Sequence, residues 1–237
     1  GCSFTFDGLK ETLLSVSPGI QYKLKEVHQL LVNYRTTKDI LVVANTILKM
    51  LTETFPGAIG YVRPERAVKD LGLRVVMCDW QIAKKHEIIL GDNQSFIFSP
   101  CDSAALSEEA NAWLKNHPLI LSSLDSKGLE FDDVIVAFDF DRKIWDLSRK
   151  LEGTLRMLRE LYVAVTRAQR RVVILVKSEN KEMGGFFRTL GCEEVVTSTL
   201  MQDFRACTTP EQWFATGMSY YLGDLFRIAA RCFTQAG

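Results

Sequence analysis

The sequence contains four polar residues that could act on a phosphate ester. Arg35 and Arg167 each carry a planar guanidinium group that suits phosphate oxygens. Lys127 stands beside Gly128, and a lysine with the backbone amides of a glycine turn can hold phosphate. Glu130 follows closely, and a carboxylate can accept a hydrogen bond from a sugar hydroxyl. Considered alone, each residue is read more simply as a solvated surface charge.

Arg167 stands at the end of a segment with helical spacing. In Leu158–Gln169, apolar residues recur every three or four positions, which indicates an amphipathic helix. Val172–Val176 is a short apolar run that indicates a buried strand. We therefore expect Arg167 to lie at the far end of a helix, next to a strand. Arg170 and Arg171 would follow the helix, where positive charge suits the helix dipole.

Arg35 precedes a second helical pattern. The apolar spacing of Ile40–Leu51 predicts a helix, and Thr36 or Thr37 is a good N-cap for it. The stretch Asn33–Arg35 would then stand just before a helix N-terminus, which favours anions. The alternative is that the tyrosine of this stretch packs and the arginine is an ordinary surface residue.

Lys127 and Glu130 stand between two predicted strands. These strands are Leu119–Ser123 and Val134–Phe138, and the polar segment between them contains a glycine. This arrangement places both charged residues at the edge of a sheet. The simpler alternative is a hairpin-like turn with two solvated charges.

Other segments complete the expected organisation. Strands are predicted at Leu73–Trp80 and Ser95–Ser99, and residues 1 to 32 contain two predicted helices. A further helix should begin at Ser107, within an imperfect capping box. The acidic stretch Asp139–Arg142 lacks the spacing and glycine of a calcium loop, so we interpret it as a solvated strand end.

The C-terminal segment matches the template of a tetratricopeptide repeat. The matching positions are Trp213, Gly217, Tyr220, Ala229, Phe233 and Ala236. Thr216 replaces the usual leucine before the glycine. One repeat cannot bury its own apolar face. The segment is therefore either the start of a repeat array or an amphipathic hairpin that docks on the main domain, and the sequence favours neither.

Composition limits the function classes. The chain has 237 residues, with 29 Lys and Arg against 29 Asp and Glu, so nucleic-acid binding would need a local basic patch. No apolar run approaches the roughly 20 residues of a membrane span. The six cysteines form no CxxC pair, which favours reduced thiols in a nuclear or cytoplasmic protein. Because Gly1 stands where an initiator methionine would be, we expect an excised fragment.

Three segments, in order, resemble motifs IV, V and VI of the UvrD/Rep/PcrA class of superfamily 1 helicases. The segments are Asn33–Arg35, Ser126–Phe131 and Leu161–Ala168, within about residues 31 to 176. In finer detail, the chain is similar to the large tetratricopeptide-and-ankyrin-repeat UvrD-like helicases of eukaryotes. The resemblance implies an α/β, RecA-like domain with a mostly parallel sheet and flanking helices at residues 1–205. A tetratricopeptide-like helical hairpin would follow at residues 206–237.

The resemblance also implies how the chain handles nucleotide. ATP would lie between this lobe and a first lobe that carries the P-loop lysine and the carboxylates for Mg²⁺. Tyr34 would stack on the adenine, Glu130 would bond the ribose, and Arg35 and Arg167 would reach the γ-phosphate. The two arginines should then converge at one rim of a common sheet. No metal ligands are expected on this chain.

The same resemblance implies contacts with single-stranded nucleic acid, with DNA favoured over RNA. Lys127 and Gly128 would line the junction between nucleotide and nucleic acid, and Ser122 and Ser123 would contact the strand. Leu124 occupies a position where the family usually carries a histidine, so coupling between the two sites is in question. The first lobe is a further expected partner, and the repeat region could recruit proteins.

The chain departs from a complete motor in one important respect. No G-x-x-x-x-G-K-[ST] stretch occurs, so the chain cannot cradle ATP phosphates by itself. We expect helicase and ATP-hydrolase activity only from a longer protein, and none from this fragment alone. The alternative is a catalytically degenerate helicase fold that serves as a scaffold. A nuclease-linked repair subunit is a third reading, but no nuclease carboxylate cluster is evident.

Overall fold

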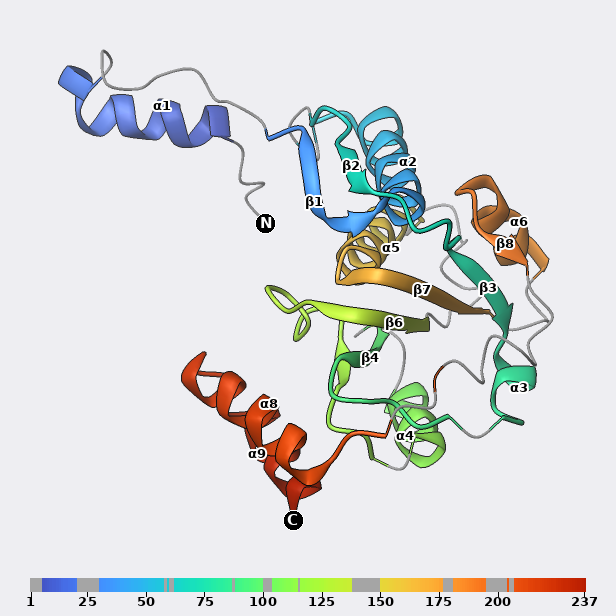
Figure 1. Cartoon of the computed structure of the whole chain (residues 1–237). Coiled ribbons are helices and arrows are strands. Elements are labelled where there is room, and N and C mark those ends of the chain that lie inside the picture. Colours follow the sequence, from blue (N-terminus) through green and yellow to red (C-terminus); the bar gives the residue numbers. More distant parts are fainter. Residues whose placement is uncertain are drawn as a thin grey trace.

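A parallel sheet with helices on both faces forms the body of the chain in a computed structural model (Figure 1). The structure describes residues 6–20, 30–57, 59, 62–86, 88–99, 104–114, 116–137, 150–176, 181–194, 204 and 207–237. Six parallel strands follow the order β5-β4-β6-β7-β3-β8. They are β3 (Val76–Asp79), β4 (Gln94–Phe98), β5 (Ile120–Ser122), β6 (Phe131–Ala137), β7 (Ala168–Val176) and β8 (Glu193–Glu194). The expected α/β architecture is confirmed, and it is consistent with a RecA-like domain.

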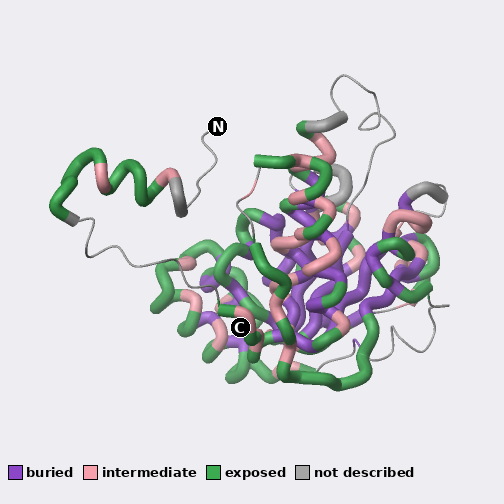
Figure 2. Tube along the Cα trace, turned by 90° about the horizontal axis from the view of Figure 1, so that it is seen from above, coloured by how far each residue is buried: buried purple, intermediate pink, exposed green. Residues whose placement is uncertain are grey.

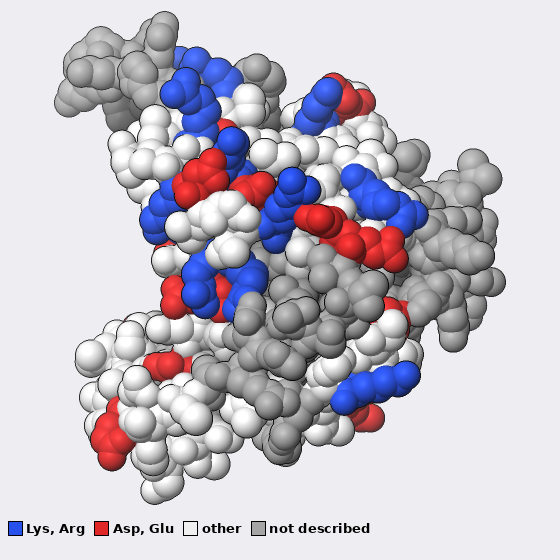
Figure 3. Space-filling view, turned by 45° about the vertical axis from the view of Figure 1, so that its right-hand side comes forward, with Lys and Arg blue, Asp and Glu red and all other residues white. Residues whose placement is uncertain are grey.

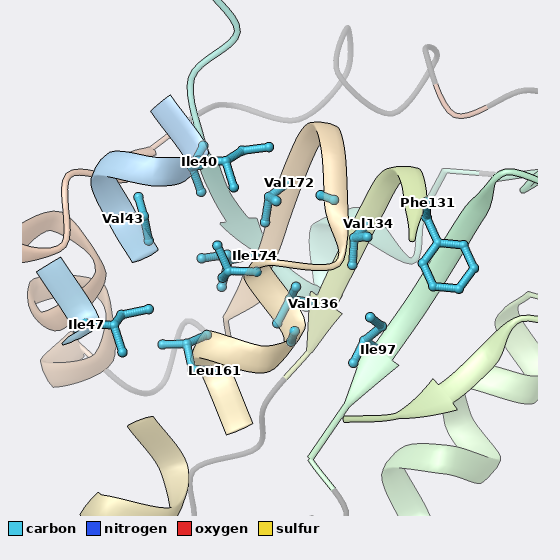
Figure 4. Close-up of a cluster of buried hydrophobic side chains, with 14 of the residues drawn as sticks. Ile40, Val43, Ile47, Ile97, Phe131, Val134, Val136, Leu161, Val172 and Ile174 are labelled. Atoms are coloured by element: carbon cyan, nitrogen blue, oxygen red, sulfur yellow. The ribbon is translucent and has the colours of Figure 1, made fainter. Parts of the chain in front are cut away.

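Two helical layers sandwich this sheet because its strands are apolar on both faces. On β7, Val172 and Ile174 join one apolar cluster, whereas Val173 and Leu175 join the other. The first cluster includes side chains of α2 (Lys38–Thr54), α5 (Lys150–Val165) and α6 (Lys181–Thr189), and Figure 4 shows part of it. The second includes side chains of α3 (Trp80–Ala83) and α4 (Ala104–Trp113). Figure 2 shows the buried strands inside these layers.

A separate pair of parallel strands holds the segment that carries Arg35. β1 (Val32–Thr37) pairs with β2 (Arg66–Lys69) and not with the main sheet. The Thr36 hydroxyl donates to the carbonyl of Ala168 at 2.8 Å, which fastens β1 to the start of β7. Thr37 is the N-cap of α2, as predicted, although its side chain makes no cap hydrogen bond.

The helix predicted to continue through Arg167 to Gln169 ends earlier, so this predicted boundary was wrong. Helix α5 ends at Val165, and β7 begins at Ala168. The Thr166 hydroxyl bonds back to the carbonyl of Tyr162 at 2.8 Å, a local bond typical of a helix end. The amide of Phe131 donates to the carbonyl of Arg167 at 2.9 Å, so the sheet captures the backbone at that point. Arg167 therefore lies in a short link between helix and strand.

Three further expectations change. The segment between β5 and β6 is not a hairpin, because both strands pair parallel to β4 and lie on opposite sides of it. Helix α4 begins at Ala104, so Ser107 lies inside it and is not an N-cap. Arg170 and Arg171 belong to β7 rather than following a helix.

The N-terminal region is described only in part. α1 (Phe6–Val16) and the short 3-10 helix η1 (Pro18–Ile20) confirm the first predicted helix. The second predicted helix, at about residues 24 to 31, lies largely outside the described residues, as does the acidic stretch at 139–142. Among the helices that the structure describes, none is long and apolar enough to cross a membrane.

The C-terminal hairpin lies against the main domain. It consists of α8 (Pro210–Leu222) and α9 (Phe226–Ala236) (Figure 1). Thr216 donates to a carboxylate oxygen of Asp92 at 3.0 Å, and the rings of His117 and Trp213 stack edge-on with centroids 5.3 Å apart. Arg231 reaches the carbonyl of Ile120, in edge strand β5, at 3.4 Å. The hairpin is therefore docked, which is compatible with either sequence-based alternative.

Gly217 allows the two helices of this hairpin to approach closely. A Cβ atom at this position would lie 2.6 Å from Cε1 of Phe233 and 3.3 Å from Cβ of Cys232. We expect Gly217→Ala to lower the free energy of unfolding by about 1–3 kcal/mol, because overpacking forces the ring aside. Urea unfolding checks this result. Gly185→Ala is the matched control: its Cβ would meet nothing within 4 Å, so it should leave stability unchanged or raise it.

His117, beneath Trp213, makes stability dependent on pH. Burial lowers the pKa of His117 from 6.5 to about 4, against the opposing effects of the Leu90 and Gly91 carbonyls and the Asp92 charge. The unfolded chain binds this proton at higher pH than the folded chain. This contribution to stability is therefore complete above about pH 6.5 and is lost on acidification towards pH 4, by about 3 kcal/mol.

Urea unfolding at pH 7 and pH 5 tests this dependence. His117→Gln should flatten the difference between the two pH values, whereas His86→Gln should preserve it. A full pH dependence in the His117→Gln variant would assign the titration to another group.

Candidate nucleotide-facing site

The backbone around Arg35 is fixed on both sides. The side-chain oxygen of Asn33 accepts hydrogen bonds from the amides of Arg35 and Thr36, at 2.9 and 3.0 Å. The Lys69 ammonium donates to the carbonyl of Arg35 at 3.1 Å. These bonds explain the asparagine of the Asn33–Arg35 stretch, because its short amide caps the backbone that follows. The arginine is thus presented by an anchored strand.

The guanidinium of Arg35 is also anchored. Its Nε lies 2.7 Å from Oε1 of Glu130, and the two side chains are 49% and 34% exposed. The second carboxylate oxygen of Glu130 accepts a hydrogen bond from Nε2 of Gln169 at 2.8 Å. Glu130 immediately precedes β6, and Gln169 is the second residue of β7, so adjacent parallel strands bring them together. In this state both oxygens of Glu130 already have protein partners.

Arg167 is held by its own domain. Nε donates to the carbonyl of Val163 at 3.0 Å, Nη1 to the carbonyl of Leu129 at 3.2 Å, and Nη2 to the Thr166 hydroxyl at 3.2 Å. Within the described residues no carboxylate forms an ion pair with it. Burial and then the nearby Arg35 charge lower the pKa of Arg167, while Glu130 and Tyr162 work in the opposite direction. An anion between the two arginines would therefore be stabilised.

Two aromatic residues flank these charges. Tyr34 precedes Arg35 in β1 and is 71% exposed. Tyr162 is half-buried, and its pKa is raised by burial and then by Glu65, against the effect of Arg167. Glu65 in turn accepts a hydrogen bond from the Asn33 amide at 2.7 Å. No local pattern predicts a role for Glu65 or Gln169, because only the packing of distant segments brings them here.

The segment between β5 and β6 runs from the carboxyl ends of the parallel strands to their amino ends. It leaves the carboxyl end of β5 at Ser122 and returns to the amino end of β6 after Glu130. Lys127 and Gly128 are exposed on the way, and the φ angle of +83° at Gly128 favours glycine. Leu124 is 51% exposed. Lys127 therefore lies on the path between these two ends of the strands.

The serines predicted to contact nucleic acid lie at the carboxyl ends of the parallel strands, whereas Glu130 lies at their amino ends. Ser122 is 8% exposed, and its hydroxyl donates to Asp125 at 2.7 Å. Ser123 is 1% exposed. As the chain stands, neither hydroxyl is offered at the surface. The amide of Ser126 bonds to the carbonyl of Ser122 at 3.0 Å, which closes the turn over them.

The structure brings Arg35, Glu130 and Arg167 together from three separate segments, and Tyr34 precedes Arg35 on β1. They do not share one sheet rim as expected, since Arg35 belongs to the separate β1–β2 pair. On the face seen in Figure 3, basic and acidic side chains are interspersed, which fits the zero net charge. No cluster of three or more metal-ligating side chains occurs in the described part of the chain.

Comparisons with known proteins place this geometry in context. No protein-family model matches the sequence. The chain is similar to the human TPR and ankyrin repeat-containing protein 1, with 23% identity over 274 aligned residues; the match covers 91% of this chain and 9% of that protein. Among solved structures, it is similar to the C-terminal domain of a possible DNA helicase from Lactobacillus plantarum, with TM-score 0.35 and 18% identity. That match covers 61% of this chain and 88% of the bacterial domain.

Proposed function

We propose that this chain is the second motor lobe of an ATP-dependent, UvrD-like helicase or translocase. The convergence of Arg35, Glu130 and Arg167 supports the proposal most directly. These residues come from the three segments that resemble motifs IV, V and VI, and two cations surround one carboxylate. The cluster has a net positive charge, and the exposed Tyr34 precedes Arg35 in the sequence, two features that suit a nucleotide half-site.

In the proposed reaction, water attacks the γ-phosphorus of ATP, the bond to the β–γ bridging oxygen breaks, and ADP and phosphate leave. Arg35 and Arg167 would stabilise the charge on the phosphoryl group in flight. Tyr34 would stack on the adenine, and Glu130 would accept a ribose hydroxyl at a carboxylate lone pair that its present partners leave open. Mg²⁺ and the P-loop lysine would be supplied by a first lobe, because the cluster on this chain consists of cations and one carboxylate.

Movement on nucleic acid would follow from closure of the two lobes. The segment from Ser122 to Glu130 links the sheet edge proposed to face nucleic acid with the edge that carries the arginines. Lys127, exposed on this segment, would lie between the bound nucleotide and the nucleic acid. The human relative is named for its TPR and ankyrin repeats, and the match covers nearly all of this chain, which supports reading the C-terminal hairpin as part of a repeat region.

The test is ATP hydrolysis by the natural full-length protein, with and without single-stranded DNA or RNA. We expect turnover that nucleic acid stimulates, and no turnover by the 237-residue chain alone. Hydrolysis by the isolated chain, abolished by Arg167→Ala, would contradict the shared-site proposal. Equal stimulation by DNA and RNA would contradict the preference for DNA.

One observation favours a second candidate function, a protein-binding scaffold. The hairpin exposes large apolar side chains: Phe214, Met218, Tyr221, Leu222 and Phe226. Contiguous apolar surface of this kind commonly binds protein. The scaffold reading predicts a full-length protein with a damaged P-loop and no ATP turnover, so the same assay separates the two functions.

A further inference from the structure

The environment of Glu130 suggests a role that precedes any contact with ribose. Its Oε1 holds Nε of Arg35 at 2.7 Å, and its Oε2 is held by Nε2 of Gln169 at 2.8 Å. This contact is an ion pair between two partly exposed side chains, and it restrains where the guanidinium group lies. The carboxylate is itself fixed, because its second oxygen is tied to the strand that bears Gln169.

Arg35 is an exposed residue with unusually many of its polar groups engaged. The amide is held by Asn33, the carbonyl by Lys69, and Nε by Glu130. Within the described residues, no hydrogen bond from Nη1 or Nη2 is present, and the ion pair with Glu130 has its 2.7 Å contact at Nε. Those two nitrogens form the fork that binds phosphate oxygens in a bidentate manner.

The chain therefore presents Arg35 with one side fastened and the phosphate-binding side unoccupied. A long arginine side chain loses considerable conformational entropy when it is immobilised on a ligand. Fixing Nε beforehand lowers that loss and places the fork in a reproducible position. Replacing Gln169 or Glu130 should make the guanidinium group of Arg35 more mobile and leave the fold unchanged.

We propose that Gln169 and Glu130 are positioning residues for Arg35, which hold its Nε so that Nη1 and Nη2 meet an incoming phosphate. This inference deepens the proposed function and rests on it for the identity of the ligand. Its first test does not, because the positioning exists in the isolated chain.

The test follows the Nε–Hε signal of Arg35 by ¹⁵N NMR, assigned from its loss in Arg35→Lys. Exchange of Hε with water should be slower than for Arg227, which is exposed and has no ion pair among the described residues. Gln169→Ala should accelerate the exchange several-fold, and Glu130→Ala more strongly. Gln235→Ala, at an exposed helical position, is the matched control and should leave it unchanged.

Exchange unaffected by Gln169→Ala would overturn the role of Gln169, and exchange unaffected by Glu130→Ala would overturn the whole inference. In the full-length protein, Gln169→Ala should lower kcat for ATP several-fold with KM nearly unchanged, and the melting temperature should stay constant. A protein without ATPase activity would sink the proposed function, while the exchange rates would still report on the positioning.

Discussion

Arg167→Ala in the full-length protein should lower kcat for ATP hydrolysis by about 10³-fold or more, the range typical of an arginine that stabilises phosphoryl transfer. KM for ATP should change far less, because the guanidinium would act on charge that develops in the transition state. Three hydrogen bonds to its own domain hold this side chain in place before any ligand arrives. Steady-state ATPase kinetics measure both constants.

Arg35→Ala should produce a loss of similar kind, and the two substitutions should not be additive if the arginines act as a unit. Arg167→Lys keeps the charge but loses the fork, so it should recover only part of the activity. Arg227→Ala is the control, because this arginine lies on the C-terminal hairpin, outside the cluster. Wild-type kcat in both single alanine variants would end the motor interpretation.

Melting curves separate chemistry from folding in this series. Arg167 donates to the carbonyls of Val163 and Leu129, and its removal takes a donor from both. The Val163 carbonyl keeps the Thr166 hydroxyl at 3.1 Å, so the loss falls mainly on the carbonyl of Leu129. Arg35 is 49% exposed and should cost little stability. If both variants lose ATPase activity but only the Arg167 variant loses stability, the loss of activity comes from the missing contact with phosphate and not from unfolding.

The buried strands could be predicted because they are short and apolar on both faces, whereas their parallel arrangement was an implication of the family resemblance. The predicted strands Val172–Val176 and Val134–Phe138 overlap β7 and β6. The N-cap at Thr37 is one of the two predicted positions, although its hydroxyl makes no capping bond. Local patterns had mixed success, because the capping-box pattern at Ser107 lies inside α4 and does not start it.

The site could be predicted only in part, because its residues depend on packing between distant segments. Helical spacing ran past Val165, but the backbone bond from Phe131 to Arg167 ended the helix there. Nothing near Glu130 in the sequence indicates that Gln169 would take one of its oxygens. The pairing of strands β6 and β7 decides both outcomes.

Asp133 is a buried carboxylate whose partners also depend on the pairing of β6 and β7. It is 0% exposed, and it lies on β6 opposite an irregularity in β7, where one residue separates Phe131 from Asp133 but two separate Ala168 from Arg171. Adjacent strand residues normally point to opposite faces. The extra residue allows Arg170 and Arg171 to reach the same carboxylate, both at its Oδ2, at 2.7 and 3.1 Å.

Both oxygens of the Asp133 carboxylate accept hydrogen bonds. Gln94 also donates to Oδ2, at 2.8 Å, and Arg171 stacks over the ring of Phe204 with 4.4 Å between its carbon Cζ and the ring centroid. Burial acts to raise the pKa of Asp133, but hydrogen bonds from Arg170 and Gln94 and the Arg171 charge outweigh it and lower the pKa. This contribution to stability is therefore present above the unfolded pKa near 3.8 and is lost as the pH falls below it.

Asp133→Ala should destabilise the chain by about 3–5 kcal/mol, because it leaves buried arginine and amide donors without their acceptor. Asp133→Asn keeps the volume but loses the charge, and it should be intermediate. Asp132→Ala, one residue away and exposed, is the matched control and should stay within about 0.5 kcal/mol of wild type. Urea unfolding at pH 7 measures all three. If Asp133→Ala were no more destabilising than Asp132→Ala, the arginines would have an alternative partner, and the bulge would not be what makes this carboxylate necessary.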